Sequence, residues 1–320
     1  MKIVFLDRET FPTEVNFPQP SFPHELAEHA YSKPEEVEDR ISEADIIITN
    51  KVVLNSTNLP SAKNLKFIAL TATGSNNIDL DYCRKNNVQV SNIRDYGTQS
   101  VVEHVLALIF TLRRDLLAYN DMIRAGAWQE SRQFVLFSRP VVDIKGDVLA
   151  IVGKGNLGQT LAKYATALGM EVIFAERPNI SDATQVREGY VEFYEALSKC
   201  DILSLHCPLS EDNARMMGAK EFARMKKTCL LINTARGGLI DEQALADALT
   251  NGEIAGAGID VVDGEPPPAT NPLLKLTDKS NLLITPHTAW ISRAALDNAI
   301  QQNLENLEAF VAGSPIRLLT

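Results

Sequence analysis

The stretch Val148-Leu149-Ala150-Ile151-Val152-Gly153-Lys154-Gly155-Asn156-Leu157-Gly158 decides the fold of the second half of the chain. Its five apolar residues predict a buried strand, and its glycines match G-x-G-x-x-G, the turn that leads from such a strand into a helix in dinucleotide-binding domains. Gly153 permits the tight turn, Gly155 lets the backbone approach a pyrophosphate, and Gly158 lets the helix pack closely on the strand. The N-terminus of that helix favours an anion, because its N–H groups are free and its dipole is positive there.

A candidate acid follows the next predicted strand. Val172-Ile173-Phe174 is a short apolar run, and Glu176 lies 18 residues after Gly158. In a dinucleotide-binding domain, an acid at this place accepts hydrogen bonds from the ribose hydroxyls of NAD and repels the 2′-phosphate of NADP. Glu176 therefore predicts NAD as the cofactor. Arg177 and Lys154 add positive charge nearby and leave room for NADP.

Short apolar runs alternate with helix-length segments along the chain, an order that is typical of parallel α/β sheets. One expected helix, 100–114, is apolar almost all round, which indicates burial on most sides. The expected strands are 4–6, 46–48, 65–70, 88–90, 148–152, 172–174, 202–205, 229–232, 256–261 and 282–284, and the expected helices are 33–42, 79–86, 100–114, 157–168 and 293–311.

The segment 118–145 has no clear period, although it carries Trp128, Phe134 and Phe137 among charged residues. Aromatic side chains outside a periodic pattern have no obvious place in the core of their own chain. Two interpretations stay open: an arm that packs on a partner subunit, or a loop that wraps over the surface.

Composition narrows the class of protein. A length of 320 residues fits two domains, and contents of 45% hydrophobic and 22% charged residues are those of a soluble globular protein. A net charge of -10 repels phosphate backbones, so nucleic acid is not expected as a partner. No apolar run approaches the roughly 18 residues of a membrane helix. Four cysteines without metal-ligand spacing predict no metal site. Scattered thiols, together with a first apolar run that is too short and too soon charged, at Asp7, for a signal peptide, predict a cytoplasmic location.

Three ionisable residues follow predicted strands of the second half: Arg236, Glu265 and His287. In open α/β sheets the ligand crevice lies beyond the carboxyl ends of the strands, so the three are expected to line one crevice. A 2-keto acid suits them, because arginine matches its carboxylate and histidine can protonate the oxygen that hydride addition leaves at C2. A glutamate beside the histidine would favour the imidazolium and orient the ring.

Each of these residues also has an ordinary structural interpretation when it is taken alone. Arg236 could bridge loops, Glu265 could be an exposed loop acid, and His287 could be a structural histidine. Their order behind a dinucleotide turn is what favours catalysis.

With these motifs the chain resembles the D-isomer-specific 2-hydroxyacid dehydrogenase family over nearly its whole length. Two of the motifs, the Arg-Gly-Gly stretch and the later Pro-His pair, are highly specific in that order. The resemblance rests on the glycine turn, His206-Cys207-Pro208-Leu209, Ile232-Asn233-Thr234-Ala235-Arg236-Gly237-Gly238-Leu239-Ile240-Asp241, Gly258-Ile259-Asp260-Val261, Glu265-Pro266 and Thr285-Pro286-His287.

The resemblance implies roles for these residues. Arg236 would bind the substrate carboxylate and polarise the keto group, and His287 would be the acid/base with Glu265 as its partner. Asp260 would hold the nicotinamide carboxamide. The implied cofactor contacts are Gly153, Gly155, Asn156, Leu157, Gly158, Glu176, Cys207, Pro208, Thr234, Ala235, Arg236, Asp260 and His287.

The resemblance also implies an architecture: two doubly wound parallel-sheet α/β domains. Residues 1–98 with 289–320 would form a discontinuous, flavodoxin-like substrate domain, and 99–288 a Rossmann NAD-binding domain. In the first, backbone N–H groups near Thr73 and Gly74 would bind the substrate carboxylate, although an ordinary strand-to-helix turn is an alternative. A homodimer is the expected assembly.

Within the family, Asn76-Asn77-Ile78-Asp79, Tyr96-Gly97-Thr98, Glu103-His104 and His287-Thr288-Ala289-Trp290 look most like glycerate dehydrogenases, also called hydroxypyruvate reductases. The expected substrates are D-glycerate and hydroxypyruvate, or glycolate and glyoxylate. Two other readings of the fold stay open: a nucleotide-sensing scaffold similar to the family's transcriptional corepressors, and another 2-hydroxy acid specificity. Formate dehydrogenase is disfavoured, since that relative has glutamine where Glu265 stands.

Overall fold

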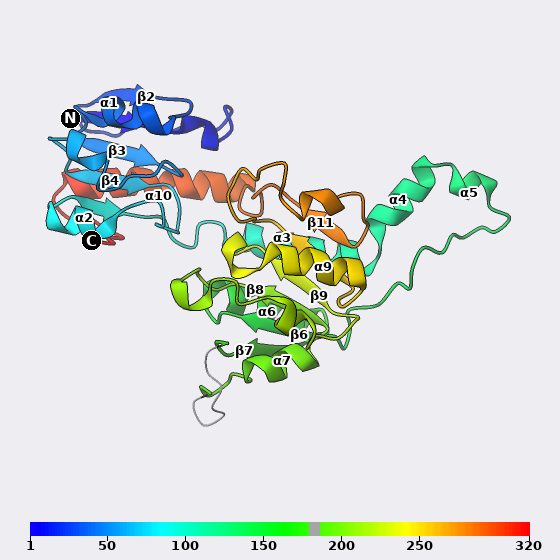
Figure 1. The fold of residues 1–320 in the computed structure, drawn as a ribbon. Coiled ribbons are helices and arrows are strands. Elements are labelled where there is room, and N and C mark those ends of the chain that lie inside the picture. Colours follow the sequence, from blue (N-terminus) through cyan, green and yellow to red (C-terminus); the bar gives the residue numbers. More distant parts are fainter. Residues whose placement is uncertain (179–185) are drawn as a thin grey trace. The chain divides into compact units, whose positions relative to one another are not determined.

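The computed structural model describes residues 1–178 and 186–320, and these form two compact units (Figure 1). One unit comprises 1–97 and 291–320, and the other comprises 98–290. The boundaries expected from the resemblance, 98/99 and 288/289, differ from these by one or two residues. None of the helices among the described residues is long and apolar enough to cross a membrane.

The first unit is built on one parallel sheet with strand order β2-β1-β3-β4-β5. This is the flavodoxin-like order 2-1-3-4-5, so the expected fold of this unit is confirmed. The strand β2, which is polar and at the sheet edge, was not expected from the sequence. The elements are β1 (Lys2–Phe5), β2 (Glu25–Glu28), α1 (Val37–Ile41), β3 (Ile46–Thr49), β4 (Phe67–Leu70), α2 (Leu80–Lys85), β5 (Gln89–Ser91) and α10 (Arg293–Val311).

Helices cover both faces of this sheet. Ile47 and Ile68 share one buried cluster with Ile41 of α1 and Cys83 of α2. On the other face, Phe310 of α10 stacks on Phe67 of β4, with ring centroids 4.4 Å apart. The last helix of the chain is therefore part of the core of the first unit, although about 200 residues of sequence separate it from the sheet.

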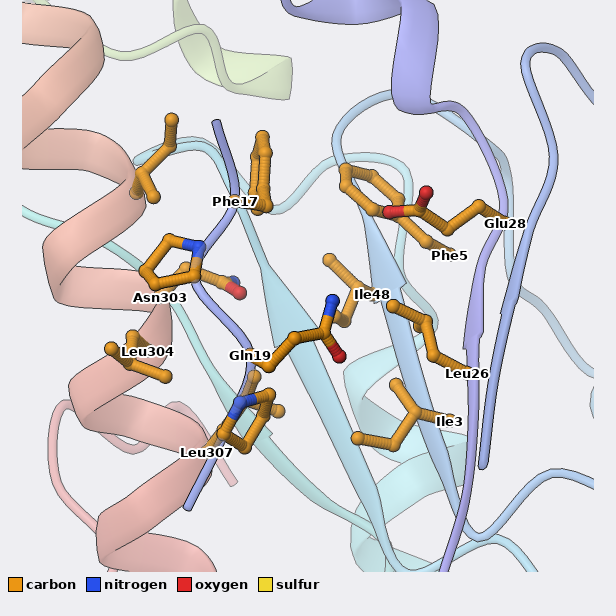
Figure 2. Close-up of a pocket in the computed structure, with 13 residues that line it drawn as sticks. Ile3, Phe5, Phe17, Gln19, Leu26, Glu28, Ile48, Asn303, Leu304 and Leu307 are labelled. Carbon is orange, nitrogen blue, oxygen red and sulfur yellow. The ribbon is translucent and has the colours of Figure 1, made fainter. Parts of the chain in front are cut away.

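A small cavity lies between the sheet and α10 in this unit (Figure 2). Phe5 and Ile48 line it from the strands, Leu307 from α10, and Phe17 and Gln19 close it from the loop after the first strand. Its volume of about 20 Å³ is room for a single water molecule. The cavity is a packing void of the core and too small for a substrate.

The second unit has a six-stranded parallel sheet with order β11-β10-β9-β8-β6-β7. Val191 adds one parallel bridge to Ala175 at the outer edge of β7, in the place of the third Rossmann strand. With that bridge the order is 3-2-1-4-5-6 with one further strand, which confirms the expected Rossmann fold. The strands are β6 (Val148–Val152), β7 (Glu171–Ala175), β8 (Ile202–Leu205), β9 (Leu230–Asn233), β10 (Gly256–Ile259) and β11 (Leu282–Ile284).

The helices of the second unit fall into two groups. The helix α3 (Thr98–Arg113) packs one face, which includes Val105 and Ile109, against β9, β10 and α6. Its opposite face, which includes Glu103 and Phe110, is exposed, so the expected burial on most sides is wrong. In contrast, α4 (Leu116–Arg124) and α5 (Ala127–Glu130) extend away from the sheet of this unit (Figure 1). The other helices are α6 (Asn156–Ala167), α7 (Phe193–Lys199), α8 (Ala219–Phe222) and α9 (Glu242–Asn251).

The glycine turn joins β6 to α6 and has the geometry that the sequence predicts. Gly153 has a φ of +112°, which side chains rarely tolerate, and the carbonyl of His206 lies directly behind it. A Cβ at Gly158 would overlap the carbonyl oxygen of Gly153, whereas a Cβ at Gly155 would meet nothing within 4 Å. Gly158 thus serves the packing of α6 on the turn, and Gly155 faces open space.

We predict that Gly158→Ala destabilises the protein and that Gly155→Ala does not. The added methyl group at position 158 must displace the backbone of Gly153, which should cost about 2–3 kcal/mol of unfolding free energy. Chemical denaturation followed by circular dichroism measures both variants. Equal midpoints for the two would contradict this division of roles.

Candidate active site

The candidate catalytic residues follow three neighbouring strands. Ile232 of β9 and Leu283 of β11 both pair with Gly258 of the central strand β10, and all three strands are parallel. Their carboxyl ends therefore lie side by side at one edge of the sheet. Arg236 follows β9, Glu265 follows β10 and His287 follows β11, so the topology delivers all three to that edge.

His287 and Glu265 form a direct pair. The imidazole Nδ1 lies 2.6 Å from a carboxylate oxygen of Glu265, and the other carboxylate oxygen accepts from the N–H of Val262 at 3.1 Å. Since the ionised carboxylate can only accept, Nδ1 carries the proton, and Nε2 is left for a substrate. The structure thus brings these two predicted residues together.

The turn that carries His287 is held by Asp260. This carboxylate is 2% exposed and accepts hydrogen bonds from Thr285 Oγ1 at 2.5 Å, Thr288 N at 2.9 Å and Ala289 N at 3.0 Å. The carbonyl of Asp260 also accepts from the N–H of His287. His287 has a φ of +55°, a left-handed conformation that is costly for a residue other than glycine. The Asp260 contacts hold it there.

A second histidine supports the same turn. His104 Nε2 on α3 lies 2.9 Å from Thr285 Oγ1 and 3.5 Å from a carboxylate oxygen of Asp260. The single hydroxyl proton of Thr285 already goes to Asp260, so His104 must donate from Nε2. The sequence offered no sign of this contact, because the two residues are 181 positions apart.

Arg236 lies in a tight turn directly after β9. Asn233 donates its amide to the Arg236 carbonyl at 2.9 Å, and the Arg236 guanidinium donates to the carbonyl of Ala235 at 2.7 Å. A Cβ at Gly237 would overlap the carbonyl group of Val262, so the arginine turn packs on the backbone of the loop that leads to Glu265. This close approach explains why glycine follows the arginine.

A pocket of about 430 Å³ opens beside the glycine turn. Among the predicted cofactor residues, Gly153, Gly155, Cys207 and Pro208 line it. Burial raises the pKa of the Cys207 thiol to about 11 and lowers the pKa of His206 to about 4, so both side chains are neutral at pH 7.

The residues present fit a dinucleotide. The space over Gly155 is open where a pyrophosphate would approach the backbone. In the part of the chain that the structure describes, the buried hydroxyl of Thr234 has no hydrogen-bond partner, as expected of a group that meets a ligand. Asn156 begins α6, with Leu157 next to it at the helix N-terminus.

Glu176 follows β7 where the sequence places it, but its carboxylate is already paired. Both oxygens contact the guanidinium of Arg187, at 2.6 and 2.7 Å. The hydrogen bonds from Arg187 lower the pKa of Glu176 to about 2, against burial, which raises it; the backbone N–H groups of Arg177 and Arg187 lower it further. The sequence did not indicate Arg187, which stands 11 residues further on, in no recognisable motif.

The predicted substrate loop lies in the first unit, after β4. The side chain of Thr73 donates to the Ile93 carbonyl at 2.9 Å, and the Thr73 carbonyl accepts from Asn92 at 2.8 Å. Gly74 follows and is partly exposed. The loop is anchored to the strand-end segment 92–93, and its role toward a carboxylate stays a prediction.

A Rossmann unit with a glycine turn, a dinucleotide-sized pocket and a histidine–carboxylate pair at its strand ends defines a class, the nicotinamide-dependent oxidoreductases. The NAD binding domain of the D-isomer specific 2-hydroxyacid dehydrogenases matches residues 106–289. The chain belongs to this family and is an oxidoreductase of the D-2-hydroxyacid dehydrogenase type.

Similar proteins extend over the whole chain. A putative 2-hydroxyacid dehydrogenase of Haemophilus influenzae is 43% identical, with 97% of this chain and 98% of the relative covered. The glycerate dehydrogenase of Methylorubrum extorquens is 42% identical over 98% of this chain and 97% of its own. The D-lactate dehydrogenase of Aquifex aeolicus, solved with NAD and lactic acid, has a TM-score of 0.80 at 26% identity, covering 98% of this chain and 96% of its own.

We predict that Glu176→Gln lowers the free energy of unfolding by about 1–3 kcal/mol at pH 7, the range for a hydrogen-bonded charged pair. Because the pKa of Glu176 is lowered from 4.5 to about 2 on folding, its contribution is complete above pH 4.5 and is lost as the pH falls toward 2. Urea denaturation at pH 7, 5 and 3.5 should therefore show the difference from wild type shrinking in acid.

The matched control is Glu188→Gln, which removes a neighbouring exposed carboxylate. It should change the unfolding free energy by less than about 0.5 kcal/mol. A Glu176→Gln variant as stable as wild type at pH 7 would show that the ion pair with Arg187 contributes nothing.

Proposed function

We propose that this protein reduces hydroxypyruvate to D-glycerate and catalyses the reverse oxidation, with glyoxylate as a second substrate. The observation that carries the proposal is the 2.6 Å contact between His287 and Glu265 at the strand ends of an NAD-binding unit. The glycerate dehydrogenase of M. extorquens, similar over nearly the full length of both chains, supports the choice of substrate.

The proposed chemistry divides between the cofactor and the chain. When bound, the reduced nicotinamide cofactor supplies the hydride for C2 of the keto acid. As C2 receives it, the carbonyl oxygen gains negative charge and takes the proton of His287 Nε2, the nitrogen that Glu265 leaves free. Glu265 keeps Nδ1 protonated and offsets the positive charge of the imidazolium. In the oxidation direction His287 takes the proton back.

Arg236 is proposed to bind the substrate carboxylate and to polarise the keto oxygen. Its guanidinium keeps its charge at any working pH and presents a fork that matches a carboxylate. The backbone N–H groups near Thr73 and Gly74 of the first unit are proposed to bind a substrate carboxylate. Asp260 is proposed to accept from the nicotinamide carboxamide as well as holding the His287 turn.

The direct experiment is a panel of hydroxypyruvate, glyoxylate and pyruvate, each assayed with NADH and with NADPH and followed by the loss of absorbance at 340 nm. We expect hydroxypyruvate to have the highest kcat/KM. A panel in which no 2-keto acid is reduced with either NADH or NADPH would overturn the proposal.

We predict that Arg236→Ala lowers kcat/KM for every 2-keto acid by about 100-fold to 1000-fold, the usual loss when one charged donor to a reacting oxygen is removed. The control is Arg224→Ala. Arg224 follows α8, its guanidinium stacks on the ring of Tyr194, and it is not part of the proposed site. Near-normal kcat/KM in the Arg236→Ala variant would remove this residue from the mechanism.

We also propose that the segment predicted at 118–145, which the structure shows as an extension over 116–142 and which is named the arm, packs on a second copy of this chain. Phe134 is 88% exposed and Phe137 is 82% exposed, values unusual for large apolar side chains. Leu116, Ile123 and Trp128 on the same segment are also exposed. The arm extends away from the sheet of its own unit (Figure 1), and these apolar side chains are exposed on it.

We predict that the double variant Phe134→Asp, Phe137→Asp runs as a single chain in size-exclusion chromatography with light scattering, whereas the wild type has the mass of two. Charge placed in an apolar interface is costly because it must be desolvated. Tyr31→Asp changes an exposed aromatic residue of the other unit and should leave the mass unchanged. A wild-type protein with the mass of one chain would contradict the dimer.

A cytoplasmic location is the last part of the proposal. The four cysteines are scattered through the chain, and three of them, Cys83, Cys200 and Cys229, are buried. Scattered thiols of this kind are typical of proteins from a reducing compartment.

A further inference from the structure

Glu176 stands where an acid normally selects NAD, but other groups of this protein occupy all its hydrogen-bond acceptor sites. The carboxylate of Glu176 accepts four hydrogen bonds, from Arg177 N at 2.9 Å and from Arg187 N, Nε and Nη2 at 3.2, 2.7 and 2.6 Å. A carboxylate offers about four lone-pair sites, and the Glu176 side chain is 0% exposed. Glu176 therefore has no acceptor left for a ribose hydroxyl.

The ion pair also cancels the charge that would repel a phosphate. Glu176 is paired with Arg187 in a bidentate arrangement, so the pair is close to neutral as seen from outside. The carboxylate engages two of the five N–H groups of the guanidinium, and the Arg187 side chain is about half exposed. Arg187 thus keeps donors on the pocket side, which it lines.

Two further cations line the same pocket. Arg177 directly follows Glu176 and is exposed, and Lys154 is the variable residue between the first two glycines of the turn. Lys154 Nζ lies 5.0 Å from the ring centre of Phe174 and 5.1 Å from that of Tyr190. Its ammonium is therefore held in place by two aromatic faces before any ligand arrives.

Tyr190 connects two of the three cations. The guanidinium of Arg187 lies 4.0 Å from the centre of the same ring that Lys154 approaches. Among the described residues of the pocket wall, the acidic one is Asp212. His206 is neutral because burial lowers its pKa to about 4. Among the described residues that line the pocket, basic groups outnumber acidic ones, in a chain whose net charge is -10.

We propose that Lys154, Arg177 and Arg187 form a binding site for the 2′-phosphate of an NADP-type cofactor, and that Glu176 serves as the internal counter-ion of Arg187 and not as a ribose acceptor. The proposal rests on the proposed function, because it names the cofactor of that same reaction. It reverses the expectation that an acid at position 176 selects NAD.

Isothermal titration calorimetry of the full chain with nucleotide fragments tests this without turnover. The probes are 2′,5′-ADP, which carries the 2′-phosphate, 3′,5′-ADP, which has the same charge in another place, and ADP. We expect 2′,5′-ADP to bind at least about tenfold more tightly than either of the others, and this advantage to shrink as salt rises.

Lys154→Met and Arg177→Gln should each reduce that advantage by about fivefold, because each removes one charge from the phosphate site. Lys227→Met removes a positive charge from an exposed lysine of the same unit that does not line the pocket, and it should leave the advantage unchanged. Glu176→Gln should leave ADP and NAD binding within about twofold, because the proposal gives its carboxylate no ribose contact.

Three results would overturn the proposal: equal affinity for 2′,5′-ADP and ADP, equal affinity for 2′,5′-ADP and 3′,5′-ADP, or a large loss of NAD affinity in Glu176→Gln. The last would return Glu176 to the ribose hydroxyls. These outcomes concern binding only, so they are distinct from failure of the proposed function, which is the absence of keto-acid reduction with both cofactors.

Discussion

The chemistry of the 98–290 unit depends on three parallel strands that end together at one edge of its sheet. Main-chain pairing sets β9, β10 and β11 side by side, so the turns after them are neighbours whatever the sequence distance between them. Glu265 and His287 are 22 residues apart in the chain and 2.6 Å apart in space for this reason. The pairing of the three strands therefore determines where these two side chains lie.

Within that frame, Asp260 determines the shape of the last turn. Three hydrogen bonds to its carboxylate, each worth about 1–3 kcal/mol in such settings, outweigh the roughly 1–3 kcal/mol that a left-handed histidine costs. His104 supports the arrangement from α3 through Thr285. The strain at His287 is therefore tolerated because buried polar groups need partners and find them in this turn.

The sequence predicted the parts of the fold that depend on local pattern. Buried parallel strands appear as short apolar runs, and the helix expected at 293–311 is found at Arg293–Val311. The polar edge strand β2 has no apolar run, so it was missed. The helices α4, α5, α7, α8 and α9 were not predicted either. Among the candidate site residues, Arg236, Glu265 and His287 could be predicted because they belong to recognisable sequence motifs.

Arg187, by contrast, stands in no motif, and only the folded chain brings its guanidinium to Glu176. An acid at the end of the second Rossmann strand is usually taken from the sequence to select NAD. For this chain that rule is not sufficient, because the sequence does not show that Arg187 pairs with the acid. A sequence shows which side chains are charged. It does not show whether a charged side chain is already paired with an opposite charge in the folded protein.

The most direct test of the central claim is the single-turnover rate of hydride transfer from the reduced nicotinamide cofactor to hydroxypyruvate in His287→Asn. Asparagine tolerates the left-handed backbone of this turn, so the variant should fold as the wild type does. The account predicts a rate at saturating cofactor that is lower by about 100-fold to 10,000-fold, the usual loss of an acid/base group. A wild-type rate in this variant would contradict it.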